Sequence, residues 1–140
     1  MADPGSNRST MEALKRILHI EDDESIRMIT SVTLESVGNL DVCSCESGFE
    51  GLEQFPVFKP QVVLLDVMMP ELDGPGTLEE LKKRFDLGEI MVIFMTAKVQ
   101  QEELDHFRSI GGFDVIEKPF DPMALSGKIQ QCWEQFNASR

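Results

Sequence analysis

Short apolar segments alternate along the chain with longer segments in which apolar residues recur every three or four positions. The first pattern is typical of buried strands and the second of amphipathic helices. Glycine, proline and aspartate residues between the segments mark turns. The sequence therefore predicts five strands and five helices in strict alternation, with the strands at residues 16–20, 40–45, 61–66, 90–95 and 113–117.

Three of the expected helices carry a well-defined apolar stripe, which should face the core. Pro56 and Pro60 are expected to break the chain between elements, because proline removes a backbone donor and disrupts a helix interior. The predicted stripes are Ile26, Ile29, Thr33 and Val37 in the first helix, Leu78, Leu81 and Phe85 in the third, and Leu125, Ile129, Cys132 and Phe136 in the fifth.

Strict alternation of strands and helices predicts a doubly wound α/β fold, in which helices cover both faces of a five-stranded parallel sheet. Ligands of such sheets bind outside the carboxyl ends of the strands. We therefore expect the residues that end the strands to meet at one edge. These are Glu21 and Asp22 after the first strand, Asp66 at the end of the third, Thr96 after the fourth and Lys118 after the fifth.

The apolar run at residues 62–65 ends on a carboxylate, Asp66. A charge at the end of a buried strand is costly unless it is paired, binds a metal or is there to react. Carboxylates that share a pocket repel one another and favour a hard divalent cation with oxygen ligands, Mg²⁺. Asp66 would then suit nucleophilic attack on a phosphoryl group, with Thr96 and Lys118 as donors to its oxygens.

Composition narrows the class of protein further. A chain of 140 residues with 41% apolar content is sufficient for one domain with its own core. The net charge of -12 argues against direct binding to nucleic acid or to an anionic membrane, and no apolar run reaches the roughly 20 residues of a membrane span. We expect a cytoplasmic domain at residues 11–140, preceded by a disordered leader or tag at residues 1–10.

Four segments resemble the receiver domain of two-component response regulators, a family that includes the single-domain chemotaxis regulator. Each segment alone is a weak signal, but all four in this order and spacing are specific. The resemblance covers about residues 15–136 and implies a flavodoxin-like (βα)5 fold. The segments are I-L-H-I-E-D-D-E-S-I-R at 17–27, V-V-L-L-D-V-M-M-P-E-L-D-G at 62–74, F-M-T-A-K at 94–98 and I-E-K-P-F at 116–120.

The resemblance also implies roles for individual residues. Asp66 would accept a phosphoryl group from the phosphohistidine of a histidine kinase or phosphotransfer protein. Thr96 would be the switch hydroxyl and Lys118 the phosphate-contacting lysine, joined to Pro119 by a cis peptide, while Asp23 would help to start the following helix. The implied ligands of Mg²⁺ are Glu21, Asp22, Asp66 and the backbone carbonyl of Met68.

One position departs from the family pattern. Three residues before the lysine the family usually has an aromatic side chain that rotates inward on phosphorylation, whereas this chain has Val115. A β-branched side chain has no comparable rotamer swing, so the coupling of Thr96 to the surface would rely on backbone movement. Phe113, placed on the same strand face by the period of two, is a candidate substitute.

The resemblance thus implies a phosphorylation switch and not an enzyme. Its partners would be a downstream effector protein or a second copy, bound through the face of the fourth helix, fifth strand and fifth helix. One alternative is a protein-binding module that works without phosphorylation. A Mg²⁺-dependent phosphohydrolase of the haloacid-dehalogenase type is disfavoured, because Met68 stands where that class needs a second acid.

Overall fold

The computed structural model describes residues 12–140, so the expected leader at residues 1–10 lies outside the described residues. Five parallel strands form one sheet in the order β2-β1-β3-β4-β5. All five predicted strands are confirmed, and each bound lies within one residue of its prediction. The strands are β1 (Arg16–Ile20), β2 (Asp41–Cys45), β3 (Val62–Asp66), β4 (Met91–Thr96) and β5 (Asp114–Glu117).

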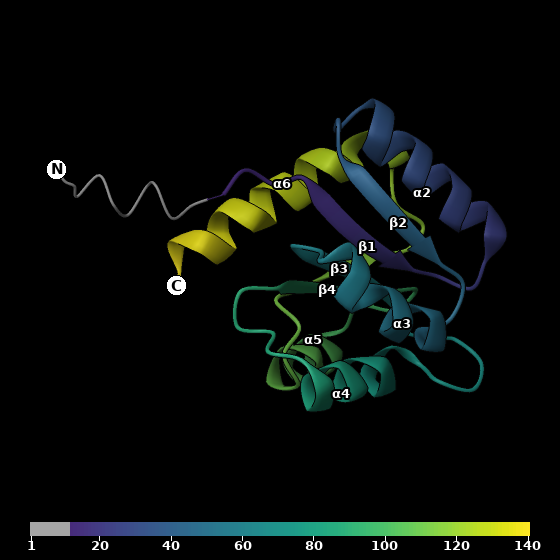
Figure 1. Cartoon of the computed structure of the whole chain (residues 1–140), viewed down its shortest axis with the longest axis vertical. Coiled ribbons are helices and arrows are strands. Elements are labelled where there is room, and N and C mark those ends of the chain that lie inside the picture. Colours follow the sequence, from purple (N-terminus) through teal and green to yellow (C-terminus); the bar gives the residue numbers. More distant parts are fainter. Residues whose placement is uncertain (1–11) are drawn as a thin grey trace, which may run out of the picture.

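Helices cover both faces of the sheet, which confirms the doubly wound α/β fold. Figure 1 shows α2 and α6 on one side of the sheet and α3, α4 and α5 on the other. Each side encloses its own apolar core, and the central strands β3 and β4 are buried along their whole length. The helices are α2 (Glu24–Ser36), α3 (Gly48–Phe58), α4 (Gly74–Arg84), α5 (Gln101–Ser109) and α6 (Pro122–Ala138).

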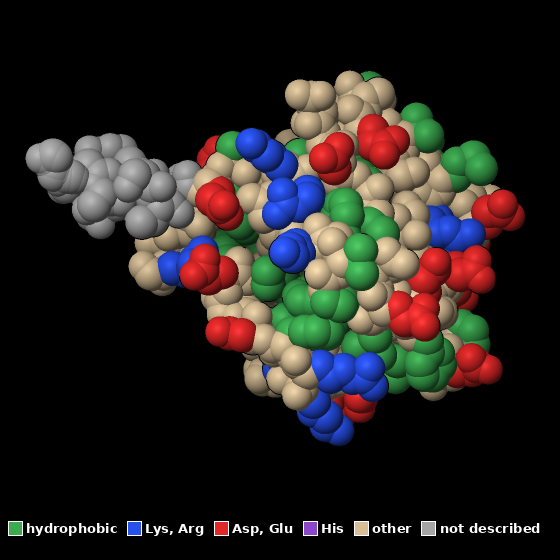
Figure 2. Space-filling view, in the orientation of Figure 1, with side chains coloured by type: hydrophobic (Ala, Val, Ile, Leu, Met, Phe, Trp, Pro, Cys, Tyr) green, Lys and Arg blue, Asp and Glu red, His purple; other side chains and the backbone are tan. Residues whose placement is uncertain are grey.

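The buried face of α2 differs from the predicted stripe. Thr30, Thr33 and Leu34 face the core, whereas Ile29 and Val37 are 42% and 45% exposed. Thr33 is buried as predicted, with its hydroxyl bonded to the carbonyl of Ile29. The prediction is wrong for Ile29 and Val37, because the spacing of apolar residues does not show which face of the helix meets the sheet. Apolar side chains consequently remain on the outer surface of α2, as Figure 2 shows. They are Met28, Ile29, Val32 and Val37.

Pro56 lies inside α3 and not between elements, contrary to the prediction. Its missing N–H removes one internal hydrogen bond close to the end of the helix. The chain leaves the helix at Lys59, whose φ of 56° is left-handed. A proline this near the carboxyl end is therefore compatible with the helix that precedes it.

The helices can also be compared with the length and apolarity of a membrane span. Within residues 12–140, no helix combines the length and the apolarity that are needed to cross a membrane.

Candidate functional site

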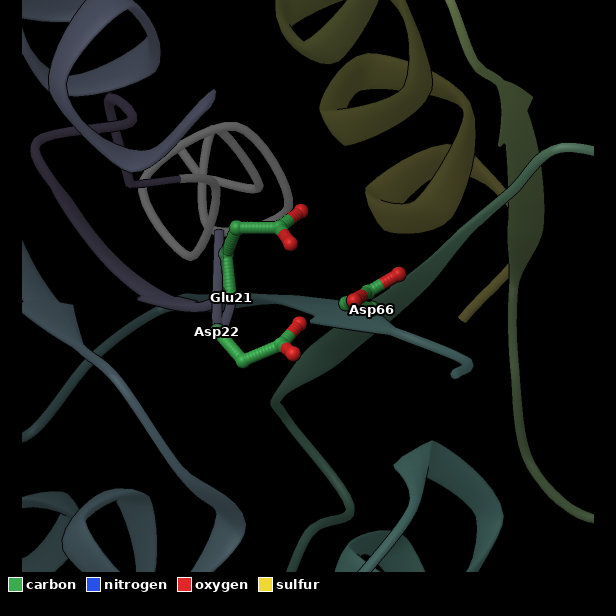
Figure 3. A group of neighbouring side chains, drawn as sticks. All are labelled: Glu21, Asp22 and Asp66. Atoms are coloured by element: carbon green, nitrogen blue, oxygen red, sulfur yellow. The ribbon is translucent and has the colours of Figure 1, made fainter. Parts of the chain in front are cut away.

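The ends of β1 and β3 bring three carboxylates together. The two strands are neighbours, with Ile20 level with Leu65, so Glu21 and Asp22 follow directly beside Asp66. One ligand oxygen from each of the three lies within 4.8 Å of the others. Figure 3 shows these carboxylates converging on one space, and Figure 2 shows acidic side chains gathered on this side of the molecule. The predicted acidic cluster is therefore present.

Hydrogen bonds hold Glu21 in place from both sides. Its backbone N–H donates to the carbonyl of Cys45 (3.0 Å), and its carboxylate accepts from the N–H of Asp23 (3.2 Å). The guanidinium of Arg27 donates to the Glu21 carbonyl (2.8 Å), a contact that sequence reasoning missed. Asp23 caps α2 by accepting from the N–H of Ile26 (2.9 Å), as predicted.

Lys118 reaches the acidic cluster from the end of β5. Its ammonium donates to Asp66 Oδ1 (3.0 Å) and to Glu21 Oε1 (3.1 Å). Its backbone N–H donates to the carbonyl of Thr96 (2.8 Å), and the Lys118–Pro119 peptide is cis, as predicted. One cation therefore bridges the two buried carboxylates.

Burial shapes the charge state of this site. Burial, followed by the neighbouring charge of Asp66, raises the pKa of Glu21 from 4.5 to about 7, although Lys118 partly offsets this. Burial also raises the pKa of Asp66, against the opposing effect of Lys118. Burial alone would lower the pKa of Lys118, but its bonds to Asp66 and Glu21 outweigh that effect and raise it. When its three carboxyls are ionised, the cluster carries more negative charge than Lys118 balances.

Thr96 and Met68 lie beside the cluster without a described contact to it. Thr96 ends β4, next to β3, and is 6% exposed, and its hydroxyl accepts a long bond from the N–H of Lys98 (3.4 Å). Met68 follows Asp66 by two residues and points its side chain outward, 77% exposed. The roles of the Thr96 hydroxyl and of the Met68 carbonyl remain predictions.

Gly74 contributes to the site in a way that sequence reasoning missed. Its N–H donates to the carbonyl of Val67 (2.9 Å), which folds the loop after β3 back onto the strand end. A Cβ atom at this position would collide with the carbonyl of Asp66. Only glycine permits this close approach, and the loop thereby holds the backbone of Asp66 and Val67.

The structure also shows where Val115, which replaces the family's usual aromatic residue, and Phe113 lie. Val115 is buried in the core on the side of α3, α4 and α5. Phe113 precedes β5 and instead packs edge-on against Phe136 of α6, with ring centroids 5.4 Å apart. The prediction that Phe113 might share the face of Val115 is wrong, because the period of two does not extend beyond the first residue of the strand.

The donor set fits a hard divalent cation. All three converging side chains offer carboxylate oxygens, which Mg²⁺ prefers, and no soft ligand from the described residues joins the group. Two of the three carboxyls are buried with raised pKa values, so a second positive charge would relieve their repulsion. Glu21, Asp22 and Asp66 are thus the residues that would hold such an ion.

Comparison with known proteins agrees with this geometry. Residues 17–130 match the family model described as "Response regulator receiver domain". The chain is 38% identical over 116 residues to a "Probable transcriptional regulator ycf27" of Porphyridium aerugineum, covering 83% of this chain and 47% of that protein. It is 32% identical to "Transcriptional regulatory protein CseB" of Streptomyces coelicolor, covering 86% and 50%. The chain therefore spans about half the length of these curated relatives.

Solved structures show the same fold. The chemotaxis protein CheY4 of Vibrio cholerae superposes with a TM-score of 0.79 at 23% identity, covering 86% of this chain and 99% of that one. A CheY-like response regulator receiver domain protein from Methanospirillum hungatei gives 0.77 at 27% identity, covering 91% and 99%. Since the family model spans most of the chain, the protein belongs to the response regulator receiver domain family.

Proposed function

We propose that this domain is a phosphoacceptor switch in which Asp66 takes a phosphoryl group from a phosphohistidine of a histidine kinase or phosphotransfer protein. The observation that carries the proposal is the buried carboxylate of Asp66, placed among Glu21, Asp22 and Lys118 at the carboxyl edge of the sheet. A structural ion pair alone would need only one carboxylate for the lysine. The surplus of negative charge instead fits a site that receives a cation and an anionic group together.

The residues present suit each part of the transfer. A carboxylate oxygen of Asp66 attacks the phosphorus, the P–N bond breaks, and its electron pair returns to the imidazole nitrogen of the donor. Lys118, now bound to Asp66 and Glu21, supplies a donor to the incoming phosphoryl oxygens, and Thr96 supplies a hydroxyl. Bound Mg²⁺, held by Glu21, Asp22, Asp66 and the carbonyl of Met68, would neutralise charge between the carboxylates and the phosphoryl group.

We propose further that the output surface is the α5–β5–α6 face, formed by the fourth and fifth described helices and the strand between them. Phe107 is the one buried residue of α5, and no side-chain hydrogen bond caps the start of this helix. Asp114 of β5 lies near Arg108 of α5 (3.6 Å) and Lys128 of α6 (3.7 Å). A weakly anchored helix beside β5 can shift when Thr96 moves, and a partner or a second copy would bind the altered face.

The test is the intact-protein mass after incubation with acetyl phosphate and Mg²⁺. We expect an adduct of one phosphoryl group, lost in Asp66→Asn and after chelation of the metal. Asp41→Asn, which removes an equal charge from an exposed site at the other end of the sheet, should label normally. Failure of the unaltered protein to label at low temperature, where the adduct lasts longer, would reject the proposal and favour a binding module that needs no phosphorylation.

A further inference from the structure

Arg27 of α2 binds the backbone of two residues of the acidic cluster and not their carboxylates. Its guanidinium donates to the carbonyl oxygens of Glu21 (2.8 Å) and Asp22 (3.3 Å). Within residues 12–140 it forms no ion pair. A guanidinium is planar and suits a carboxylate well, so its use on two backbone carbonyls next to several acids is a specific arrangement.

The start of α2 directs this side chain toward the cluster. Arg27 is the fourth residue of the helix, and its backbone N–H donates to the carbonyl of the capping residue Asp23 (2.9 Å). Side chains on a helix lean toward its amino end, so that of Arg27 reaches back over the turn that joins β1 to α2. Arg27 is half-buried there.

Asp22 depends on this turn more than the other two acids of the cluster do. Lys118 holds the carboxylates of Glu21 and Asp66. Asp22 is exposed and has no ion pair among the described residues. The position of its carboxylate therefore follows from the position of its backbone, whose carbonyl accepts from Arg27.

The turn is tied to the fold on two sides. The N–H of Glu21 donates to the carbonyl of Cys45 in β2 (3.0 Å), and Arg27 holds the turn from α2. Hydrogen bonds from a charged donor are stronger than those between neutral groups. Arg27 thus fixes the backbone from which Glu21 and Asp22 extend toward Asp66, at adjacent positions of the chain (Figure 3).

We propose that Arg27 is a positioning residue for the cation site, which keeps the carboxylates of Glu21 and Asp22 in place by holding the carbonyls of the same two residues. The inference rests on the proposed function, in which Mg²⁺ binds at this cluster. Mg²⁺ demands near-ideal octahedral geometry, so a small displacement of a ligand weakens its binding. Loss of a residue that orients metal ligands typically lowers metal affinity by roughly 10–100-fold.

The charge of Arg27 separates this role from plain electrostatics. A guanidinium near the cluster repels a divalent cation, so the loss of its charge alone would tighten cation binding. The loss of its two hydrogen bonds would instead release the turn and weaken binding. The direction of the change in affinity therefore distinguishes positioning from charge.

The test is the affinity of the unphosphorylated protein for Mn²⁺, measured by electron paramagnetic resonance of the free ion, and for Mg²⁺ by competition. Arg27→Met keeps the apolar stem and should raise both dissociation constants roughly tenfold. Arg27→Lys keeps the charge and one donor site, so its constants should lie between those of Arg27→Met and the unaltered protein. Arg84→Met removes an equal charge from an exposed position at the far end of α4 and should bind normally.

NMR of the metal-free proteins gives a second measurement, which also verifies that each variant is folded. The carbonyl carbons of Glu21 and Asp22 should shift in Arg27→Met, which removes their donor, and not in Arg84→Met. Unchanged carbonyl shifts, or Arg27→Met binding as tightly as the unaltered protein, would overturn the proposal. So would Arg27→Lys binding no more tightly than Arg27→Met.

The same titration separates this proposal from the proposed function. If the unaltered protein binds neither Mn²⁺ nor Mg²⁺, the cation site itself is absent, and both proposals fail. If the unaltered protein and Arg27→Met bind equally well, only the role of Arg27 fails, and the site on Glu21, Asp22 and Asp66 stands.

Discussion

The raised pKa of Glu21 predicts that the metal-free protein becomes less stable as the pH rises through neutrality. In the folded protein this carboxyl has a pKa of about 7, against 4.5 for its ordinary value, because it is buried beside Asp66. The folded state therefore holds the proton more tightly than the unfolded state does. The stability that comes from this proton is present at acid pH and is lost as the pH rises toward and past 7.

The size of the effect follows from the same shift. Glu21 is 1% exposed, so solvent screening is small. Linkage between a folded pKa of about 7 and an ordinary value of 4.5 gives a loss of about 1 kcal/mol in the free energy of unfolding between pH 6 and pH 8. The measurement is urea unfolding at 25 °C at a series of pH values, in the presence of a chelator.

Two variants isolate the contribution of Glu21. Glu21→Gln removes the titrating group and should flatten the pH dependence between pH 6 and pH 8. Glu53→Gln removes the same charge from an exposed position on α3 and should leave the slope unchanged. Saturating Mg²⁺ should stabilise the unaltered protein more at pH 8 than at pH 6, since the ionised carboxylates bind it best. A slope that persists in Glu21→Gln would refute the assignment.

Three further predictions concern stability alone, each measured by urea unfolding at pH 7. Gly127→Ala in α6 should stabilise the protein by about 0.5–1 kcal/mol, because the added methyl meets no atom within 4 Å and alanine favours the helix; a loss would contradict the helical geometry there. Asp73→Ala should cost about 1 kcal/mol, since the carboxylate caps α4 through the N–H of Gly76 (2.8 Å), and no change would mean that the cap is not formed. Leu64→Ala should cost about 2–5 kcal/mol, because this fully buried side chain lies in the central strand, and a cost under about 1 kcal/mol would contradict its packing.

Local patterns in the chain were sufficient to predict the strands and the edge of the sheet at which the candidate site lies. Apolar runs as short as residues 62–65 favour buried strands over helices. The alternation of such strands with helical segments favours a parallel sheet. Because parallel strands all end at the same edge, Asp66 and Lys118 could be expected together before any coordinates were known. The charge at a buried strand end was the strongest local signal.

Tertiary packing decided which strands are neighbours and which face of each helix is buried. The strand order places β1 beside β3, and only this neighbourhood makes Glu21 and Asp66 share Lys118 and raises the pKa of Glu21. The rotation of α2, which buries Thr30 and exposes Ile29, depends on the surfaces of β2 and α6 that the helix meets.

The orientation of Phe113 likewise depends on its contact with Phe136 of α6, which is 23 positions away in the chain. Strand and helix periods report which residues can share a face of one element. They do not report which neighbour that face meets, because contacts between distant segments form only when the whole chain packs. The sequence by itself therefore determined the strands and the candidate site residues at their ends, and the tertiary structure decided which neighbours these residues meet and how their pKa values shift.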